Sequence, residues 1–182
     1  LDVSGCDKLQ SLDISYSTIT KVTLPSSAVL KEYNLSGTDI TSLKLENQSF
    51  LETLLIADCN KLTTIEINNC PSLTTLNVPQ NVSTIIIRNC EGMKELSIPY
   101  TSVNNSISPL KSVTIDNCPG MTTFSVAGQN NTGLKIELTG AWNLEVLDLS
   151  NTSTTDILLP SINRAPFFTS LRRLNISNTD IY

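Results

Sequence analysis

The chain has 182 residues, of which 40% are hydrophobic and 16% charged, and its formal net charge is −5 at pH 7. This composition permits a packed core, but it lacks the basic surface that nucleic-acid binding requires, so we expect no nucleic-acid partner. No segment reaches the ~20 consecutive apolar residues of a membrane-spanning helix, and we therefore expect no membrane insertion in this segment.

Short triplets, each with two apolar residues around one variable residue, recur along the whole chain. One series, which we call row A, starts at Leu12, Tyr33, Leu54, Leu76, Leu96, Phe124, Leu147 and Leu174. The second series, row B, lies between these and starts at Leu1, Val22, Leu43, Ile65, Ile85, Val113, Ile136 and Ile157. The first two starts are 21 residues apart in each row, and the rows keep step through later insertions. A repeat of this length indicates a solenoid.

Alternation of apolar and polar residues within each triplet predicts a half-buried strand. Leu12 and Ile14 would face one side, and Asp13 and Ser15 the other. No stretch keeps helical spacing of apolar residues over three turns. We therefore predict a mostly β fold, a solenoid of about eight ~21-residue coils with parallel strands on both sides. We expect it to form a single domain over residues 1–182. Both ends lie within the repeat, so we read the chain as a piece of a longer protein.

An apolar residue stands three positions before every row A triplet, as Leu9 does before Leu12. The combined pattern LxxLxLxx(N/C/T/S) resembles the leucine-rich repeat. In that family the last slot turns inward and hydrogen-bonds backbone groups of neighbouring coils. The slot is filled here by Ser17, Thr38, Cys59, Asn81, Thr101, Gln129, Thr152 and Thr179.

The stretch CPSLTTLNVPQNVSTIIIRNC, from Cys70 to Cys90, is similar to the BspA-like leucine-rich repeats of bacterial surface proteins. Those repeats usually carry a glycine and an Ala-Phe pair before the second cysteine, whereas TIIIRNC stands here, which favours a second strand at that side. The resemblance implies a bacterial protein that is extracellular or on the cell surface.

Four cysteines, Cys6, Cys70, Cys90 and Cys118, share the sixth position of row B and would form one inward-facing column. The sequence has no histidine and no CxxC pair, so we expect no metal and no cofactor. Buried thiols are the favoured interpretation. A disulfide between Cys70 and Cys90 stays open, because neighbouring coils lie at a suitable separation.

Catalysis is not expected. Polysaccharide-cleaving solenoids need acidic residues on adjacent coils, but the outward aspartates of row A, Asp13 and Asp148, are six coils apart. Without histidine a Ser-His triad cannot form. A polysaccharide-acting β-helix enzyme remains as a disfavoured alternative.

We expect a recognition module that binds a protein or glycan through the outward face of row A, as the family resemblance implies. The candidate binding residues are Asp13, Ser15, Asn34, Ser36, Leu55, Asn77, Ser97, Asp148 and Asn175. The face lacks the Trp, Tyr and Arg residues typical of hot spots, so a structural spacer within a larger surface protein is the alternative. Insertions follow Pro99 and Leu159, and we expect the Phe167-Phe168 pair of the second to pack on the core.

Overall fold

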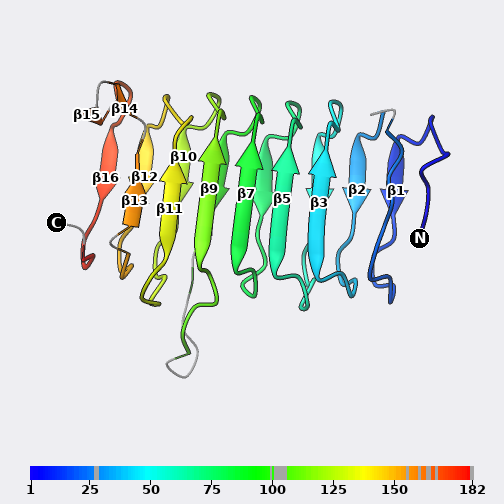
Figure 1. Ribbon diagram of the computed structural model, residues 1–182, viewed down its shortest axis with the longest axis horizontal. Coiled ribbons are helices and arrows are strands. Elements are labelled where there is room, and N and C mark those ends of the chain that lie inside the picture. Colours follow the sequence, from blue (N-terminus) through cyan, green and yellow to red (C-terminus); the bar gives the residue numbers. More distant parts are fainter. Residues whose placement is uncertain are drawn as a thin grey trace.

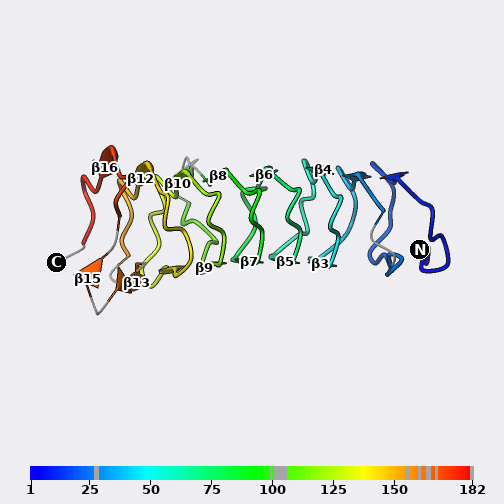
Figure 2. The same ribbon diagram turned by 90° about the horizontal axis from the view of Figure 1, so that it is seen from above.

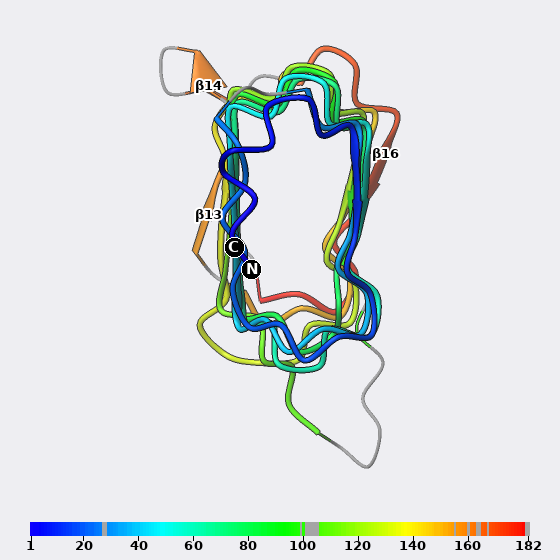
Figure 3. The ribbon, with the colours of Figure 1, turned by 90° about the vertical axis from the view of Figure 1, so that its right-hand side faces the viewer.

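The computed structural model describes residues 1–26, 29–98, 100, 106–154, 156–159, 161–162, 165–166 and 168–180. Within these residues every regular element is a strand, and the chain winds into a β-solenoid (Figure 1). Viewed along the long axis, the coils superimpose on one rectangular outline, with row A on one long side and row B on the other (Figure 3). The predicted parallel strands on both sides are confirmed.

Row A forms two parallel sheets, one of three strands and one of five, with a break in hydrogen bonding between β4 and β6. Its strands are β1 (Ser11–Asp13), β2 (Glu32–Asn34), β4 (Thr53–Leu55), β6 (Thr75–Asn77), β8 (Glu95–Ser97), β10 (Thr123–Ser125), β12 (Val146–Asp148) and β16 (Arg173–Asn175).

Row B forms one parallel sheet of six strands on the opposite side of the solenoid (Figure 2). Its strands are β3 (Ser42–Glu46), β5 (Thr64–Asn68), β7 (Thr84–Arg88), β9 (Ser112–Asp116), β11 (Lys135–Leu138) and β13 (Asp156–Leu158). The second insertion adds an antiparallel pair, β14 (Ser161–Ile162) and β15 (Ala165–Pro166). Phe168 packs against the core as predicted, whereas Phe167 lies outside the described residues.

The expected count of eight coils is slightly too high, because the solenoid has about six turns with a strand on both sides. The first two row B segments meet only at an isolated bridge between Asp2 and Thr23. Pro25 directly follows the second of these segments and has no N–H group, which shortens the ladder that could form there.

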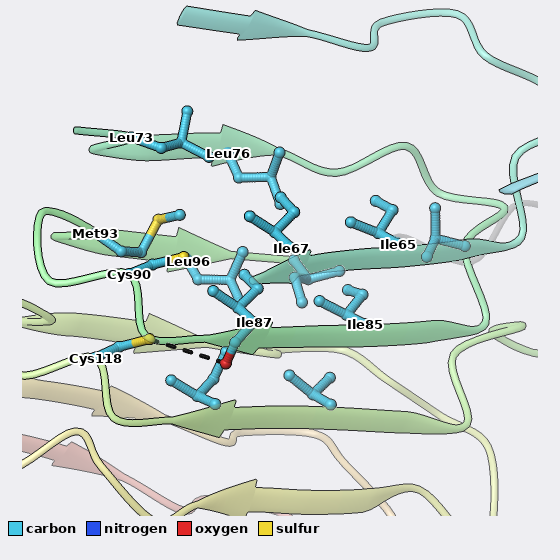
Figure 4. Packing of buried hydrophobic residues seen from close by; sticks show 14 of the residues in the cluster. Ile65, Ile67, Leu73, Leu76, Ile85, Ile87, Cys90, Met93, Leu96 and Cys118 are labelled. Atoms are coloured by element: carbon cyan, nitrogen blue, oxygen red, sulfur yellow. Dashed lines mark hydrogen bonds between the residues drawn. The ribbon is translucent and has the colours of Figure 1, made fainter. Parts of the chain in front are cut away.

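Inward residues of both rows form one continuous apolar core. In β3 the residues Leu43 and Leu45 are buried and Lys44 between them is exposed, which confirms the predicted alternation. Figure 4 shows the isoleucines of β5 and β7 stacked beside the leucines of row A. The core thins at the end of the stack, where Leu174 is 54% exposed because no described coil covers it.

The cysteine column lies inside the stack. Cys70, Cys90 and Cys118 follow β5, β7 and β9, whose strands pair in register, so the three align on consecutive turns. All three are fully buried free thiols, and Cys118 donates a weak hydrogen bond to the carbonyl of Ile87 (Figure 4). Hydrogen bonding to Cys90, together with burial, raises the pKa of the Cys70 and Cys118 thiols.

Cys6 does not share this environment, and the expectation that it is a buried member of the cysteine column is wrong. The residue is exposed, because its coil is the first described one and has a neighbour on one side only. Burial in a solenoid comes from both adjacent coils.

Asparagine makes the corner that follows four of the row B strands, β3, β5, β7 and β9. Asn47, Asn69, Asn89 and Asn117 adopt left-handed backbone conformations, with φ between 50° and 58°. Asparagine tolerates this region because its short side chain can hydrogen-bond locally. The side chains also connect coils: Asn69 Nδ2 donates to Asn47 Oδ1 at 2.8 Å, and Asn117 Nδ2 to Asn89 Oδ1 at 2.8 Å.

Among the described residues, the polar slot after row A turns inward as the leucine-rich repeat implies, and Thr101 lies outside these residues. Asn81 and Gln129 donate from their side-chain amides to carbonyls of neighbouring coils, Cys59 at 3.2 Å and Ile98 at 2.6 Å. Thr38 instead donates to a carbonyl three residues earlier in its own coil, at 2.7 Å. The same own-coil bond is made by Ser17, Thr152 and Thr179.

Candidate functional site

The candidate residues from row A lie on the outward side of its two sheets, in two separate blocks. In the three-stranded sheet the register aligns Asp13, Asn34 and Leu55. In the five-stranded sheet it aligns Asn77, Ser97, Ser125, Asp148 and Asn175. The structure therefore brings the candidates together within each sheet, and the break between β4 and β6 separates the blocks.

Exposure differs along these columns. Asp13, Leu55 and Asn77 are exposed, and Leu55 is 45% exposed despite being aliphatic. Ser36 is only 8% exposed, because the chain already turns toward the next corner at this position. Ser36 therefore offers little surface to a ligand. The remaining candidates, Ser15, Asn34, Ser97, Asp148 and Asn175, are half-buried.

Local capping explains why aspartate or asparagine is followed two residues later by serine in several row A coils. Asp13 Oδ1 accepts the backbone N–H of Ser15 at 2.9 Å and its hydroxyl at 2.7 Å. The same Asx-type turn is made by Asn34 with Ser36, Asp148 with Ser150, and Asn175 with Ser177. These side chains end each strand, so part of their hydrogen-bonding capacity is used within the protein.

The two outward aspartates are held in their charged form. The Ser15 hydroxyl and amide, together with the Asn34 side chain, lower the pKa of Asp13. Partial burial acts to raise the pKa of Asp148, but hydrogen bonds from Ser150 and the nearby charge of Arg173 lower it overall. Both groups therefore act as hydrogen-bond acceptors at neutral pH.

A groove of about 270 Å³ lies on the three-stranded sheet, beside the break. Its lining comprises Ser11, Leu12, Asp13, Glu32, Tyr33, Asn34, Thr53 and Leu55. The groove combines one exposed aliphatic side chain with two carboxylates, those of Asp13 and Glu32, which lie on adjacent coils. Such a surface can accept hydrogen bonds and contact an apolar group at the same time.

Sequence reasoning missed Ser11, Glu32 and Thr53 as members of this surface. Each begins its strand two residues before a candidate, so each points outward as well. Extending the alternation one residue upstream of every triplet would have found them. Glu32 also places a second carboxylate one coil from Asp13, which the comparison of aspartates alone did not reveal.

The groove offers no arrangement for a metal. Among the residues that the structure describes, no group of three or more Cys, Asp or Glu side chains is placed to hold a metal ion. The same residues include no helix with the length and hydropathy to cross a membrane.

Comparison with known proteins gives one informative likeness. The chain is 30% identical over 166 residues to the protein SUPPRESSOR OF npr1-1, CONSTITUTIVE 1 of Arabidopsis thaliana. The match covers 89% of this chain and 11% of the plant protein, so the chain spans about a tenth of its length. No protein-family model matches the chain. No solved structure matches it. The solenoid and the likeness to a protein of the leucine-rich-repeat type together support a leucine-rich-repeat solenoid.

Proposed function

We propose that the protein is a non-catalytic recognition module that binds a protein or glycan partner through the outward face of row A. The observation that carries this proposal is the groove on β1, β2 and β4, where exposed Leu55 stands beside the carboxylates of Asp13 and Glu32. A partner that offers donors or positive charge around a small apolar contact would complement this surface.

The BspA-like resemblance of the Cys70–Cys90 stretch supports a bacterial protein that is extracellular or on the cell surface. A rigid, parallel stack suits that role because each coil is supported by its neighbours and presents side chains at regular intervals. The proposal does not involve acid–base chemistry. A glycosidase acid needs a raised pKa, whereas the pKa of Asp13 is lowered by its own capping bonds.

A structural spacer is the second candidate. It is favoured by the capping bonds, because Asp13, Asn34, Asp148 and Asn175 all use side-chain oxygens to end their own strands. A spacer needs a straight stack and no partner on this face.

Matched aspartate substitutions separate the two functions. Leu55 and Leu158 are both exposed, at 45% and 51%, and lie at equivalent strand positions on opposite faces. The chain is immobilised and exposed to bacterial and host surface extracts and to a glycan array. If row A is the recognition face, Leu55→Asp abolishes capture of a partner that Leu158→Asp retains. Equal capture by both variants and by the unmodified chain, or no specific capture at all, would favour the spacer.

A further inference from the structure

The six-stranded sheet of row B ends abruptly at β3. β3 is the edge strand of that sheet, and in Figure 1 the arrows beyond it toward the N-terminus belong to row A. The preceding row B segment, residues 22–24, is paired on its other side only, where Thr23 bridges Asp2. Two neighbouring coils thus face each other across row B without forming a ladder.

The backbone of β3 leaves hydrogen-bonding groups on this edge. The carbonyl of Thr41 accepts from Thr63 at 2.9 Å, and the amide of Asn47 donates to Asn68 at 3.0 Å, so odd-numbered residues point toward β5. Because direction alternates along a parallel strand, the amides and carbonyls of Ser42, Lys44 and Glu46 point to the free edge. An unpaired edge of this kind is a template for another strand.

A cleft runs along the same edge. Two cavities of about 400 and 290 Å³ share Val22, Leu24, Lys44 and Leu45 in their linings, so they adjoin one another. The larger cavity reaches the inward side chains Tyr33 and Leu35 of row A. Buried apolar side chains therefore lie beneath the cleft, and its walls carry backbone hydrogen-bonding groups.

Gln48 lies at one end of the cleft, and its side-chain oxygen has no hydrogen-bond donor. The residue is 4% exposed, and its Nε2 donates across the cleft to Pro25 O at 3.4 Å and to Glu46 O at 3.3 Å. Its Oε1 is buried without a hydrogen-bond partner. A buried acceptor in this state is costly, and a ligand that brings an N–H group to it would remove that cost.

The charged residues differ between the two ends of the cleft. Lys21, with the hydroxyl residues Thr20 and Ser42, lines the end where β3 begins. Lys44 is paired with Glu46 at 3.0 Å, whereas among the described residues Lys21 forms no ion pair. An acidic group at the start of a bound strand would therefore be favoured.

We propose that this cleft binds an extended peptide, which adds to β3 as a parallel strand, inserts apolar side chains toward Tyr33 and Leu35, and carries an acidic residue beside Lys21. This binding mode is β-augmentation, in which main-chain hydrogen bonds give affinity and side-chain pockets give specificity. The site is separate from the row A face and does not depend on its function.

The chain itself supplies a probe, because β5 already pairs with the other edge of β3. The probe is a fluorescein-labelled, C-amidated peptide, Leu-Thr-Asp-Ile-Glu-Ile-Asn-Asn, which has the sequence of residues 62–69 with aspartate at the position facing Lys21. Fluorescence anisotropy with the intact chain measures binding. The matched control peptide is N-methylated at its second isoleucine, which removes one main-chain donor, and we expect it to bind about tenfold more weakly.

Variants and amide exchange locate the peptide. We expect Lys21→Glu to weaken binding, while Lys111→Glu, at another exposed lysine, and Leu55→Asp leave it unchanged. Peptide binding should slow amide hydrogen exchange at Lys44 and Glu46, with Leu45, which points to β5, as the internal reference. Absence of saturable binding, or binding without slower exchange at Lys44 and Glu46, would overturn the proposal. So would concentration-dependent dimerisation that protects these amides without peptide, because a second copy would then be the occupant.

Discussion

A leucine in the middle of the solenoid, with a coil on both sides, should contribute more to the free energy of unfolding than the equivalent leucine at the end of the stack. Leu96 and Leu174 occupy the same position of the row A repeat, in β8 and β16. Leu96 is 0% exposed and Leu174 is 54% exposed. We therefore compare Leu96→Ala with Leu174→Ala.

The expected losses follow from burial. Leu→Ala removes three carbons, which at about 0.8 kcal/mol each amounts to about 2.4 kcal/mol for a fully buried side chain. A cavity term adds to this at Leu96, which gives about 3–4 kcal/mol. At Leu174 about half of the side chain is already in water and no closed cavity forms, so we expect about 1 kcal/mol.

Urea unfolding followed by circular dichroism measures both losses as changes in the free energy of unfolding. The slope of the unfolding free energy against urea should stay the same in both variants. Equal losses at the two positions would refute the reasoning, because they would mean that packing between two neighbouring coils does not determine how much a leucine contributes to the free energy of unfolding.

Four further predictions concern corners, close approach, pH and thiols. Asn89→Ala should destabilise the chain by about 1–2 kcal/mol in urea unfolding, because alanine disfavours a left-handed backbone, whereas Asn89→Gly should cost less. An alanine Cβ at Gly120 would lie 2.1 Å from the backbone oxygen of Glu91, so Gly120→Ala should cost about 1–3 kcal/mol; an unchanged urea midpoint would contradict this packing. The pKa of Asp148 is lowered on folding, so its stabilising contribution is present above the ordinary value of 3.8 and is lost as pH falls through the lower folded value. Asp148→Asn should therefore make the urea midpoint depend less on pH between about pH 5 and 3. An unchanged dependence on pH would count against the capping bonds. A thiol reagent should label Cys6 alone in the native chain and all five cysteines in denaturant, and rapid native labelling of Cys90 would contradict its burial.

Stacking explains why so much of the fold could be predicted from spacing. Coils that stack follow nearly the same path outside their insertions, so the 21-residue step from Leu12 to Tyr33 already places these two residues opposite each other in β1 and β2. Alternation then separates Lys44 from the buried Leu43 and Leu45. These features depend on local sequence, and the structure has them as predicted.

Features that depend on neighbouring coils could not be predicted in the same way. Cys6 matches the cysteine column in sequence but is exposed, because only one of the described coils lies beside it. The sequence gives no sign of the break between β4 and β6, because the triplets at Leu54 and Leu76 have the same apolar pattern as the neighbouring triplets. The left-handed corner at Asn89 needs a backbone angle that the residue type permits but does not impose.

The candidate surface was predicted in part. Asp13, Asn34 and Leu55 do share a column, but the groove also uses Glu32, which the sequence comparison omitted. Ser36 was expected to face a ligand and is instead buried at a corner. The sequence pattern identifies which side of a strand faces outward, whereas depth and curvature at that side depend on the turns.

Pulsed electron paramagnetic resonance between spin labels tests the central claim, that coils stack in register, most directly. Lys44, Thr114, Glu137 and Leu158 lie in one outward column of row B. With Cys6→Ser to avoid stray labelling, distances from a label at Lys44 to labels at the other three positions should rise in even steps of about 4.8 Å, near 14, 19 and 24 Å. Distances that rise unevenly, or that do not increase along this series, would contradict the stacked solenoid.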